Sequence, residues 1–532
     1  MVVSIIIAAY NSADAVGMTV RAAREIGGVS EVIAVDDGSR DGTAQAARDA
    51  GADQVIVLPR NRGKGAAMAA GVEAARGHTV LFLDADLADS AALAKPLLDA
   101  VAGRAAMSVA VFPKLPGGGG LGIARGLAAA AIRLLAGVEV TAPLSGQRAM
   151  PRTIVERLGL ASRFGVETAL TAEAAHLGIP VVEVPLPMEH ARTDRTIAGF
   201  AHRARQFKDI LKYALLAGYG LGWPALRPAQ ALLRVALWLA ALALPVALTA
   251  IFVPSVAVLA AAAALCGVIA WLPCLWVSAI GLRLRKPNYL GRSLPAAGGL
   301  VLPVIGIPFV WFSGLGPHLR MAAVVVVFVF GAVGLLDDLY ASRRQARGLR
   351  GHLRALLAGR LTTGAVKAIA GLAAGAAAGA LLSPGQPAII ILDALLVALS
   401  ANLINLLDLR PGRALKGFAL ICAFCLFLAP DSLRLLAPVL ALAVVAAPAD
   451  FAGRVMLGDV GANVLGGAVG LGLAVALAPW QRLVAIVLLA AFHLACERVS
   501  FSELVQRSRV LAWLDRVGTG HLAPLPACEA GQ

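Results

Sequence analysis

Long apolar runs recur after Ala229 and limit what the chain can fold into. Each has roughly 18–25 residues, the length that a helix needs to cross the hydrocarbon core of a bilayer. Residues 1–225 instead mix charged and apolar residues as soluble domains do. We therefore expect a soluble domain followed by an all-α polytopic membrane domain of about ten helices. The expected spans are 229–252, 256–281, 296–314, 319–336, 363–383, 387–406, 414–429, 433–449, 460–479 and 482–499.

The charge distribution predicts how these spans are oriented. Lys and Arg are concentrated in the loops at 283–292, 337–354 and 408–416, whereas the intervening loops are short and carry few charges. By the positive-inside rule the basic loops face the cytoplasm, which places both chain ends there in a multi-pass protein of the cell membrane. Residues 1–10 lack the basic start of a signal peptide, which agrees with a cytoplasmic first domain.

The formal net charge of +15 has the same explanation, and it also suits binding to anionic lipid. A surface that binds nucleic acid usually combines basic with aromatic side chains, and only 5% of the residues are aromatic. We therefore expect the membrane as a partner and no nucleic acid.

In residues 1–215, short apolar strands alternate with helices. Strands are predicted at 2–9, 32–35, 54–58 and 79–83, and helices near 14–26 and 65–75. This alternation predicts an α/β domain with a parallel sheet covered on both faces. Ligands of such sheets bind at the carboxyl ends of the strands, where this sequence places polar and acidic residues.

Two acidic loops follow predicted strands. Asp36 and Asp37 follow the second strand and can accept hydrogen bonds from a nucleoside base and ribose. Asp84 and Asp86 follow the fourth strand, and their spacing lets one carboxylate bind a divalent metal while the other orients a sugar or ribose. The simpler alternative is that both loops only cap helices, as Asp-Gly-Ser turns do. Two such loops after parallel strands favour a binding site.

Residues 60–65, Arg-Asn-Arg-Gly-Lys-Gly, precede a predicted helix. The glycines, Lys64 and the helix N-terminus suit an anion such as a phosphate group. No GxGxxG motif follows the first strand, which argues against a dinucleotide-binding fold.

Six motifs occur in order in this domain: IIIAAYNS, VDDGSRDGT, NRGKGAAMAAG, LDADLAD, SGQRAM and FGVETAL. Together they resemble the family 2 glycosyltransferases, which have the Rossmann-like GT-A fold, and most closely the branch that charges polyprenyl or dolichyl phosphate with a hexose. The resemblance covers about residues 1–215. It implies a nucleotide-sugar donor and a Mg²⁺ or Mn²⁺ cofactor. The residues implied for the donor and the metal are Asp36, Asp37, Lys64, Asp84, Asp86, Gln147 and Arg148.

The acceptor determines whether catalysis needs a general base. A lipid phosphate is already ionised, whereas a hydroxyl acceptor needs a base, for which Glu167 is the candidate. Arg192 and Arg195, in the segment HARTDRT, are expected to contact phosphates, and a solvated basic stretch is the alternative. Residues 199–228 combine basic and apolar residues at helical spacing and are expected to form an interfacial helix and a linker.

Carboxylates stand at the predicted inner ends of three spans of the membrane domain, residues 229–500. Such residues are functional candidates, although they can also be simple caps on helix ends. The candidates for binding a metal and a diphosphate are Asp337, Asp338, Asp408 and Asp459. Asn402 and Asn405 precede Asp408 by six and three residues, so all three are expected on one helix face.

The motifs RSLPAAGG, GLLDDLY, SANLINLLD and MLGDVGANVLGG resemble those of the polyprenyl-phosphate phospho-N-acetylhexosamine transferases of wall-polymer synthesis. The resemblance covers about residues 256–500. It implies metal binding and catalysis by Asp337, Asp338 and Asp459. It also implies that Asn402, Asn405 and Asp408 help bind the nucleotide and the lipid phosphate.

The chain departs from this second family in several places, including an additional span near 229–252 and the apparent lack of the family's last helix. Its asparagine motif continues as DLRPGRALK at 408–416, where the family has an Asp-Gly-rich segment. The family's histidine cluster near the C-terminus is replaced by His493 and Glu497. Residues 501–532 are expected to form a cytoplasmic tail. We therefore expect the membrane domain to retain binding of a lipid phosphate more readily than recognition of a nucleotide sugar.

These patterns predict a membrane glycosyltransferase of cell-envelope glycan synthesis. The expected reaction moves a sugar from a nucleotide-sugar donor to polyprenyl phosphate or a polyprenyl-linked acceptor at the cytoplasmic face. Phosphosugar transfer by the membrane domain is a second predicted activity. The alternative is a soluble glycosyltransferase tethered to a non-catalytic domain that binds lipid or resembles a transporter. A transporter usually contains inverted repeats or broken helices, and the sequence has no clear repeat.

Overall fold

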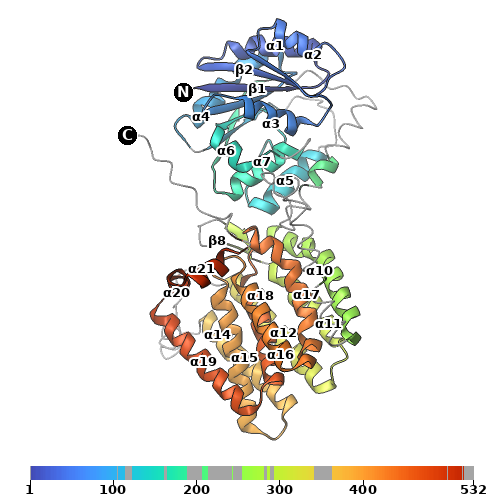
Figure 1. Cartoon of the computed structure of the whole chain (residues 1–532), viewed down its shortest axis with the longest axis vertical. Helices are drawn as coiled ribbons and strands as arrows, with labels where there is room; N and C mark the ends of the chain where they lie inside the picture. Colours follow the sequence, from blue (N-terminus) through green and yellow to red (C-terminus); the bar gives the residue numbers. More distant parts are fainter. Residues whose placement is uncertain are drawn as a thin grey trace. The chain divides into compact units, whose positions relative to one another are not determined.

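The structure is a computed structural model that describes residues 2–104, 106–113, 123–160, 165–188, 207–211, 213, 243, 254–280, 284–287, 293–296, 298–340, 362–499, 501–517 and 519. The chain forms two compact units, one built mainly from residues up to 217 and the other mainly from residues after 231 (Figure 1). Arg192, Arg195, most of 199–228 and nearly all of 229–252 lie outside the described residues.

The first unit is built on a seven-stranded sheet with the order β3-β2-β1-β4-β6-β5-β7. Its strands are β1 (Val3–Ala9), β2 (Val29–Asp36), β3 (Gln54–Val57), β4 (Thr79–Asp84), β5 (Met107–Val111), β6 (Arg148–Pro151) and β7 (Val181–Pro185). Only β6 runs antiparallel to its neighbours among these strands. The predicted mostly parallel α/β domain is confirmed.

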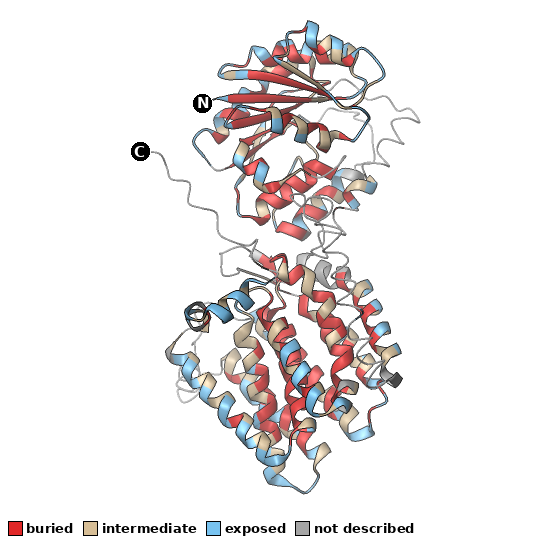
Figure 2. Cartoon of the chain, in the orientation of Figure 1, coloured by how far each residue is buried: buried red, intermediate tan, exposed pale blue. Residues whose placement is uncertain are grey.

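Helices cover both faces of this sheet, as the strand composition requires. Ile5 and Ile7 of β1 face a core layer with α1, η1 and α4, whereas Ile6 faces a second layer with α3, α6 and α7. The central strands are therefore buried on both sides (Figure 2). The helical elements are α1 (Ala13–Arg24), α2 (Thr43–Asp49), α3 (Lys64–Ala74), η1 (Ala88–Ala94), α4 (Lys95–Val101), α5 (Ile123–Ala136), α6 (Arg152–Leu158) and α7 (Val166–His176).

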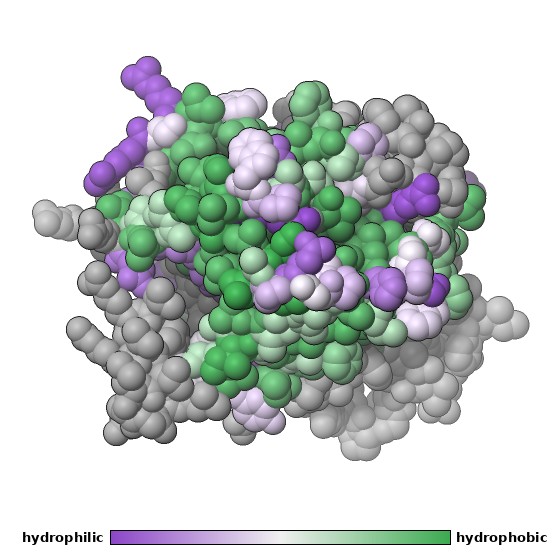
Figure 3. All heavy atoms as spheres, turned by 90° about the horizontal axis from the view of Figure 1, so that it is seen from below, coloured by the Kyte–Doolittle hydropathy of each residue, from purple (hydrophilic) through white to green (hydrophobic). Residues whose placement is uncertain are grey.

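Helices dominate the second unit, and six of them in the described part are long and apolar enough to cross a membrane. These six are α12 (Pro317–Tyr340), α14 (Thr363–Leu382), α15 (Pro387–Leu407), α17 (Leu433–Phe451), α18 (Gly458–Ala476) and α19 (Pro479–Arg498). The fused membrane domain predicted from the sequence is confirmed by these helices. Seen from below, the molecule shows many hydrophobic residues, with a group of hydrophilic ones among them (Figure 3).

Further elements complete this unit. They are α10 (Pro254–Ile280), β8 (Arg285–Pro287), β9 (Ser293–Pro295), η3 (Gly298–Leu300), α11 (Val301–Trp311), α16 (Arg413–Leu428), η4 (Pro430–Ser432), α20 (Phe501–Arg507) and α21 (Arg509–Arg516). The span expected at 296–314 is shorter than predicted, since the α-helix there has 11 residues. A 3-10 turn precedes it, and a Cβ on Gly299 in that turn would lie 2.3 Å from Gly461 of α18.

Helix α18 lies at the centre of this unit, and nearly all of its residues are buried. Small residues let its neighbours approach closely. A Cβ on Gly466 or Gly470 would lie 2.4 or 2.6 Å from backbone carbons of α15. A Cβ on Gly334 of α12 would lie 2.6 Å from the carbonyl oxygen of Asp459. This packing brings the acidic ends of α12, α15 and α18 together.

Candidate functional site

The carboxyl ends of β1, β2 and β4 meet at one edge of the sheet. Ala9 pairs with Asp36 of β2, and Ala8 pairs with Asp84 of β4. The two acidic loops therefore begin beside the same strand, as parallel pairing requires. Asp86 lies two residues beyond Asp84 in the turn after β4 and is half-buried.

Lys64 joins Asp84 to Glu167 at this edge. Its Nζ lies 2.5 Å from Asp84 Oδ1 and 2.7 Å from Glu167 Oε1. Burial lowers the pKa of Lys64, and the two carboxylates raise it by more, so the net pKa is above its ordinary value. Lys64 therefore carries its charge at neutral pH. Glu167 Oε2 is buried without a hydrogen-bond partner among the described residues.

Gln147 and Arg148 reach the same cluster from the start of β6. Gln147 Nε2 donates to Asp84 Oδ2 at 2.8 Å. Arg148 is fully buried and donates to the carbonyl oxygens of Ser145, at 2.5 Å, and Glu167, at 3.2 Å. Burial lowers the pKa of Arg148 to about 10, which leaves it charged at neutral pH. In this geometry Arg148 fixes the backbone on which Gln147 stands.

Gly146 allows this backbone to pass over the carboxylate. A Cβ at this position would lie 2.5 Å from both oxygens of Asp84 and from Lys64 Nζ. Real Cβ atoms essentially never approach other atoms this closely. A side chain here would therefore displace the ends of Asp84 and Lys64 from their present contact.

The two acids after β2 have different partners. Asp37 accepts from the backbone amides of Arg62 at 2.8 Å and Gly63 at 2.7 Å. Its carboxylate therefore positions the N-terminus of α3, where Lys64 begins the helix. Asp36 Oδ1 accepts from the amide of Ser39 at 2.9 Å, and the described residues show no hydrogen bond to its Oδ2.

Thr19 of α1 stabilises the turn that carries Asp86. The sequence patterns did not indicate this role of Thr19. Its Oγ1 donates to the carbonyl oxygen of Ala85 and accepts from the amide of Ala88, both at 2.9 Å. Ala88 has a positive φ of 47°, a conformation that non-glycine residues rarely adopt. The only sequence signal was a threonine within an apolar helix face.

Within the described residues, no three His, Cys, Asp or Glu side chains are grouped closely enough to hold a metal by themselves. Asp84 and Asp86 nevertheless fit a divalent ion that shares its coordination with a diphosphate. Hard cations take carboxylate oxygens, and Mg²⁺ in particular is usually bound by one or two carboxylates plus phosphates and water.

A second polar cluster lies where α12 ends and α18 begins. Asp338 accepts from the amides of Asp459 and Val460, both at 3.0 Å, and so caps α18. Lys286 of β8 bridges Asp338 and Asp459, with Nζ–oxygen distances of 2.7 and 3.0 Å. The structure thus brings together two of the acids that the sequence placed on different spans.

Lys367 of α14 enters the same cluster from another side. Its Nζ lies 2.5 Å from Asp459 Oδ1 and 3.3 Å from Asp337 Oδ2. When the amide of Asn405 is oriented to satisfy its neighbours, it donates to Asp459 at 2.8 Å and accepts from Lys367 at 3.2 Å. Neither Lys286 nor Lys367 was predicted, although a lone lysine within an expected apolar span was an available signal.

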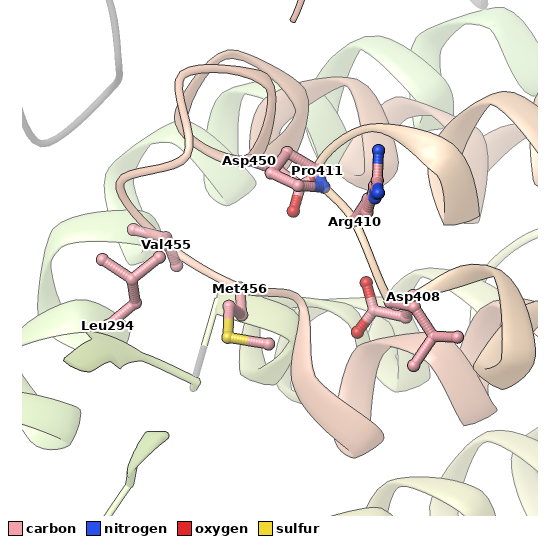
Figure 4. A pocket seen from close by; sticks show the side chains of 8 residues that line it. Leu294, Asp408, Arg410, Pro411, Asp450, Val455 and Met456 are labelled. Atoms are coloured by element: carbon pink, nitrogen blue, oxygen red, sulfur yellow. The ribbon is translucent and has the colours of Figure 1, made fainter. Parts of the chain in front are cut away.

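Asn402 is exposed, whereas Asn405 and Asp408 are half-buried. Their sharing of one helix face stays a prediction. Asp408 lines a pocket with Asp450 of α17, whose Oδ2 accepts from the amide of Gly412 at 2.6 Å (Figure 4). The other lining residues are Leu294, Leu409, Arg410, Pro411, Val455 and Met456.

The acidic loops and Lys64 fall within a segment that is similar to known proteins. Residues 4–129 match the model of glycosyl transferase family 2. This segment includes β1 to β5 and ends before Gln147, so the family 2 segment carries Asp36, Asp84 and Asp86. The chain therefore has a family 2 glycosyltransferase segment followed by helices that are suited to span a membrane.

The relatives share only this part of the chain. An undecaprenyl-phosphate 4-deoxy-4-formamido-L-arabinose transferase of Pseudomonas fluorescens is 42% identical over 94 residues, which cover 16% of this chain and 28% of the relative. The succinoglycan biosynthesis protein ExoO of Rhizobium meliloti is 44% identical over 87 residues, which cover 16% of this chain and 25% of the relative. The chain thus spans about a quarter of the length of these relatives.

A solved structure is also similar to part of the chain. It is the glucosyl-3-phosphoglycerate synthase of Mycobacterium tuberculosis in complex with Mg²⁺ and uridine diphosphate. The sequence identity is 26% and the TM-score is 0.34, with coverage of 40% of this chain and 78% of that one.

Proposed function

We propose that the chain is a membrane glycosyltransferase that moves a sugar from a nucleotide-sugar donor to polyprenyl phosphate or a polyprenyl-linked acceptor. The observation that carries this proposal is the cluster of Lys64, Asp84, Gln147 and Glu167 at the carboxyl ends of the strands. The family 2 match supports sugar transfer, and the apolar helices support an acceptor that resides in a bilayer. We place both chain ends and the sites on the cytoplasmic side of the cell membrane, because the basic loops favour that orientation.

The donor would bind along the acidic edge of the sheet. Asp36 would accept a hydrogen bond from the nucleoside through Oδ2. Asp37 would hold the loop before α3, through the amide of Arg62. Asp84 and Asp86 would hold Mg²⁺ or Mn²⁺, which supplies positive charge to the departing diphosphate. Lys64, in the first turn of α3, would orient the diphosphate together with the helix N-terminus. Gln147, which donates to Asp84, would keep the Asp84 carboxylate turned toward the metal.

The acceptor sets the role of Glu167. An ionised lipid phosphate needs no base, and Glu167 would then serve to orient Lys64 through their 2.7 Å pair. A hydroxyl acceptor would transfer its proton to Glu167 Oε2, the buried oxygen without a partner. Arg192 and Arg195 are proposed to contact the acceptor phosphate.

The membrane half is proposed to bind the phosphate of the lipid, and phosphosugar transfer is a second candidate activity. Lys286 and Lys367 favour both proposals, since their ammonium groups lie among the carboxylates of Asp337, Asp338 and Asp459. Asp338 and Asp459 would be catalytic in the second activity, with Asp337 as a further metal ligand. Asn402, Asn405 and Asp408 are proposed to serve the lipid phosphate, and Asn402 would do so from an exposed position.

The released nucleotide distinguishes the two activities. Purified full-length protein would be incubated with polyprenyl phosphate, Mg²⁺ or Mn²⁺ and a panel of nucleotide sugars. A nucleoside diphosphate reports sugar transfer by the first unit, and a nucleoside monophosphate reports phosphosugar transfer by the second. Asp86→Asn should abolish release of the diphosphate, and Asp338→Asn should abolish release of the monophosphate. The matched control is Asp89→Asn, an exposed acid three residues after Asp86.

If Asp86→Asn released the diphosphate at the wild-type rate, the proposed donor site would be wrong. If wild-type protein released neither nucleotide with any donor, the enzyme proposal itself would fail. If only the diphosphate were released, and Asp338→Asn released it at the wild-type rate, the membrane half would be a lipid-binding domain.

A further inference from the structure

Helix α21, near the end of the described chain, has an apolar face that no other described element covers. Five apolar side chains in and just after it are between 43% and 66% exposed. They are Val510, Leu511, Trp513, Leu514 and Val517. Their spacing places them on one side of the helix. An exposed apolar stripe of this kind on an eight-residue helix needs an apolar surrounding.

The polar edge of α21 is tied to the start of α16. Asp515 pairs with Arg413, at 2.5 Å to Nε and 2.9 Å to a terminal nitrogen. Lys416 donates to the carbonyl oxygens of Leu514 at 2.8 Å and Asp515 at 3.0 Å, and so satisfies the last turn of the helix. Ser508 caps the first turn by accepting from the amide of Leu511. These contacts fix the rotation of α21, so its apolar face stays turned outward.

The position of α21 fits the boundary between lipid and water. It lies at the same end of the helical unit as β8 (Figure 1). Lys286 of β8 pairs with Asp338 near the end of α12, and this helix closes with Tyr340, which is 70% exposed. Exposed Trp311 and Trp480 stand where α11 ends and α19 begins, at the opposite ends of the spans. Aromatic residues at both ends are typical of membrane-spanning units. Helix α21 therefore lies at the level of one bilayer surface.

The neighbouring surface and charge favour lipid over a protein partner. Helix α19 leads into α20 and α21, and only 6% of its most apolar stretch is buried within the protein. An apolar helix that is open to lipid therefore precedes α21 in the chain. Arg507, Arg509 and Arg516 accompany the apolar residues. Basic and apolar residues on one short helix are the composition of helices that lie on anionic membranes.

The contacts of α21 lead to the pocket of Figure 4. Arg413 directly follows Gly412, whose amide donates to Asp450 in the pocket wall. Gly412 has a φ of 77°, and a Cβ there would lie 2.4 Å from Phe451, so this loop has little freedom to adopt another shape. The end of this loop that leads into α16 is thus held by Asp450 through Gly412 and by Asp515 through Arg413.

We propose that α21 lies in the surface of an anionic bilayer with its apolar face in the lipid, and that Asp515 thereby holds the loop at 408–412 in its pocket-forming shape. The partner is the lipid surface itself. This inference is independent of the sugar-transfer reaction, because it requires only that the second unit spans a membrane.

Trp513 offers a direct test of the lipid contact. Full-length wild type and Trp513→Phe would be reconstituted in vesicles of phosphatidylcholine and phosphatidylglycerol, with acyl chains brominated near the headgroup. The difference between the two emission spectra isolates Trp513. We expect blue-shifted emission that is quenched by the brominated lipid and protected from iodide. Trp480→Phe, at the start of α19, gives the same difference measurement for a residue that faces lipid.

Two results would overturn the lipid contact. Quenching of Trp513 by iodide and not by brominated lipid would show that the face is open to water. Protection from both quenchers would assign the face to a protein partner, such as a second copy of this chain.

Hydrogen exchange tests the coupling to the pocket. In the same vesicles, Asp515→Asn should speed exchange in peptides from 408–416 by about tenfold or more, the factor expected for losing a charge-assisted bond. Leu514→Asp should produce the same change by expelling the helix from lipid, and peptides from β1 should be unaffected in both variants. Unchanged exchange at 408–416 in Asp515→Asn, with Trp513 still in lipid, would refute the coupling.

Discussion

Replacing Lys64 with methionine removes a cation that joins two acidic side chains at the edge of the sheet. Asp84 and Glu167 lie on β4 and α7, and each approaches Lys64 Nζ within 2.7 Å. Methionine keeps a similar length and apolar stem, so the change removes mainly the charge. The variant therefore isolates the electrostatic contribution of Lys64.

The magnitude follows from the distances and the burial. Each pair has a Coulomb energy of about 6 kcal/mol at an effective dielectric constant of about 20. The cost of burying the ions offsets much of this energy. After the substitution, the side chain of Glu167, which is 5% exposed, stays buried without its counter-charge. Breaking buried pairs in this way costs about 3–5 kcal/mol, and we expect the first unit to lose that much stability.

Hydrogen exchange of peptides from β1 and β4 in the full-length protein measures the free energy at which this sheet opens. The matched control is Arg24→Met, which breaks a pair with Asp53 at 3.0 Å whose side chains are 46% and 40% exposed. Exposed pairs contribute at most about 1 kcal/mol, so this control should lie close to the wild type. Adding Glu167→Gln to Lys64→Met should recover part of the loss, because it removes the unbalanced charge.

Equal opening free energies for Lys64→Met and Arg24→Met would refute the reasoning. In that case Asp84 and Glu167 would not depend on Lys64, and the cluster could not be the electrostatic centre of the proposed donor site. A double variant less stable than Lys64→Met would also contradict the explanation.

Three further predictions follow from single contacts. Gly146→Ala should lower the rate of nucleoside diphosphate release about 100-fold, because a displacement of ~1 Å in a catalytic site has a cost of this size. The control Gly126→Ala, where the new Cβ has open space, should release the diphosphate at the wild-type rate. The raised pKa of Lys64 means that, from neutral pH upward, its stabilisation persists to about pH 10 and declines above; between neutral and alkaline pH, urea titrations of wild type and Lys64→Met should converge as the pH rises. Arg482 pairs with buried Asp393 at 2.7 Å; Arg482→Leu should cost about 3–5 kcal/mol in thermal unfolding, and adding Asp393→Leu should restore most of it.

The architecture was predictable because it depends on local periodicity. Strands of β-branched residues that alternate with helices specify a parallel sheet, and long apolar runs specify spans. Parallel strands end at a common edge, so the proximity of Asp36 and Asp84 followed without knowledge of the packing. The same holds for the polar residues at the ends of α12, α15 and α18, since each is placed by the end of its own apolar run.

The partners of these acids were not predictable. Lys64 and Glu167 are far apart in the sequence, and nothing near either residue indicates that β6 runs antiparallel and brings Gln147 beside them. Helical spacing alone also did not establish that Asn402 is exposed while Asn405 contacts Lys367 and Asp459.

By itself, the sequence determined which segments are strands and spans and where along them the acidic residues stand. Only the tertiary structure decided that Lys286 and Lys367 share Asp459, and that Asp515 reaches Arg413 across about a hundred residues. The physical reason is that periodicity is a property of neighbouring residues. The choice of an ionic partner depends instead on which helices pack closely, and here glycines such as Gly466 allow that approach.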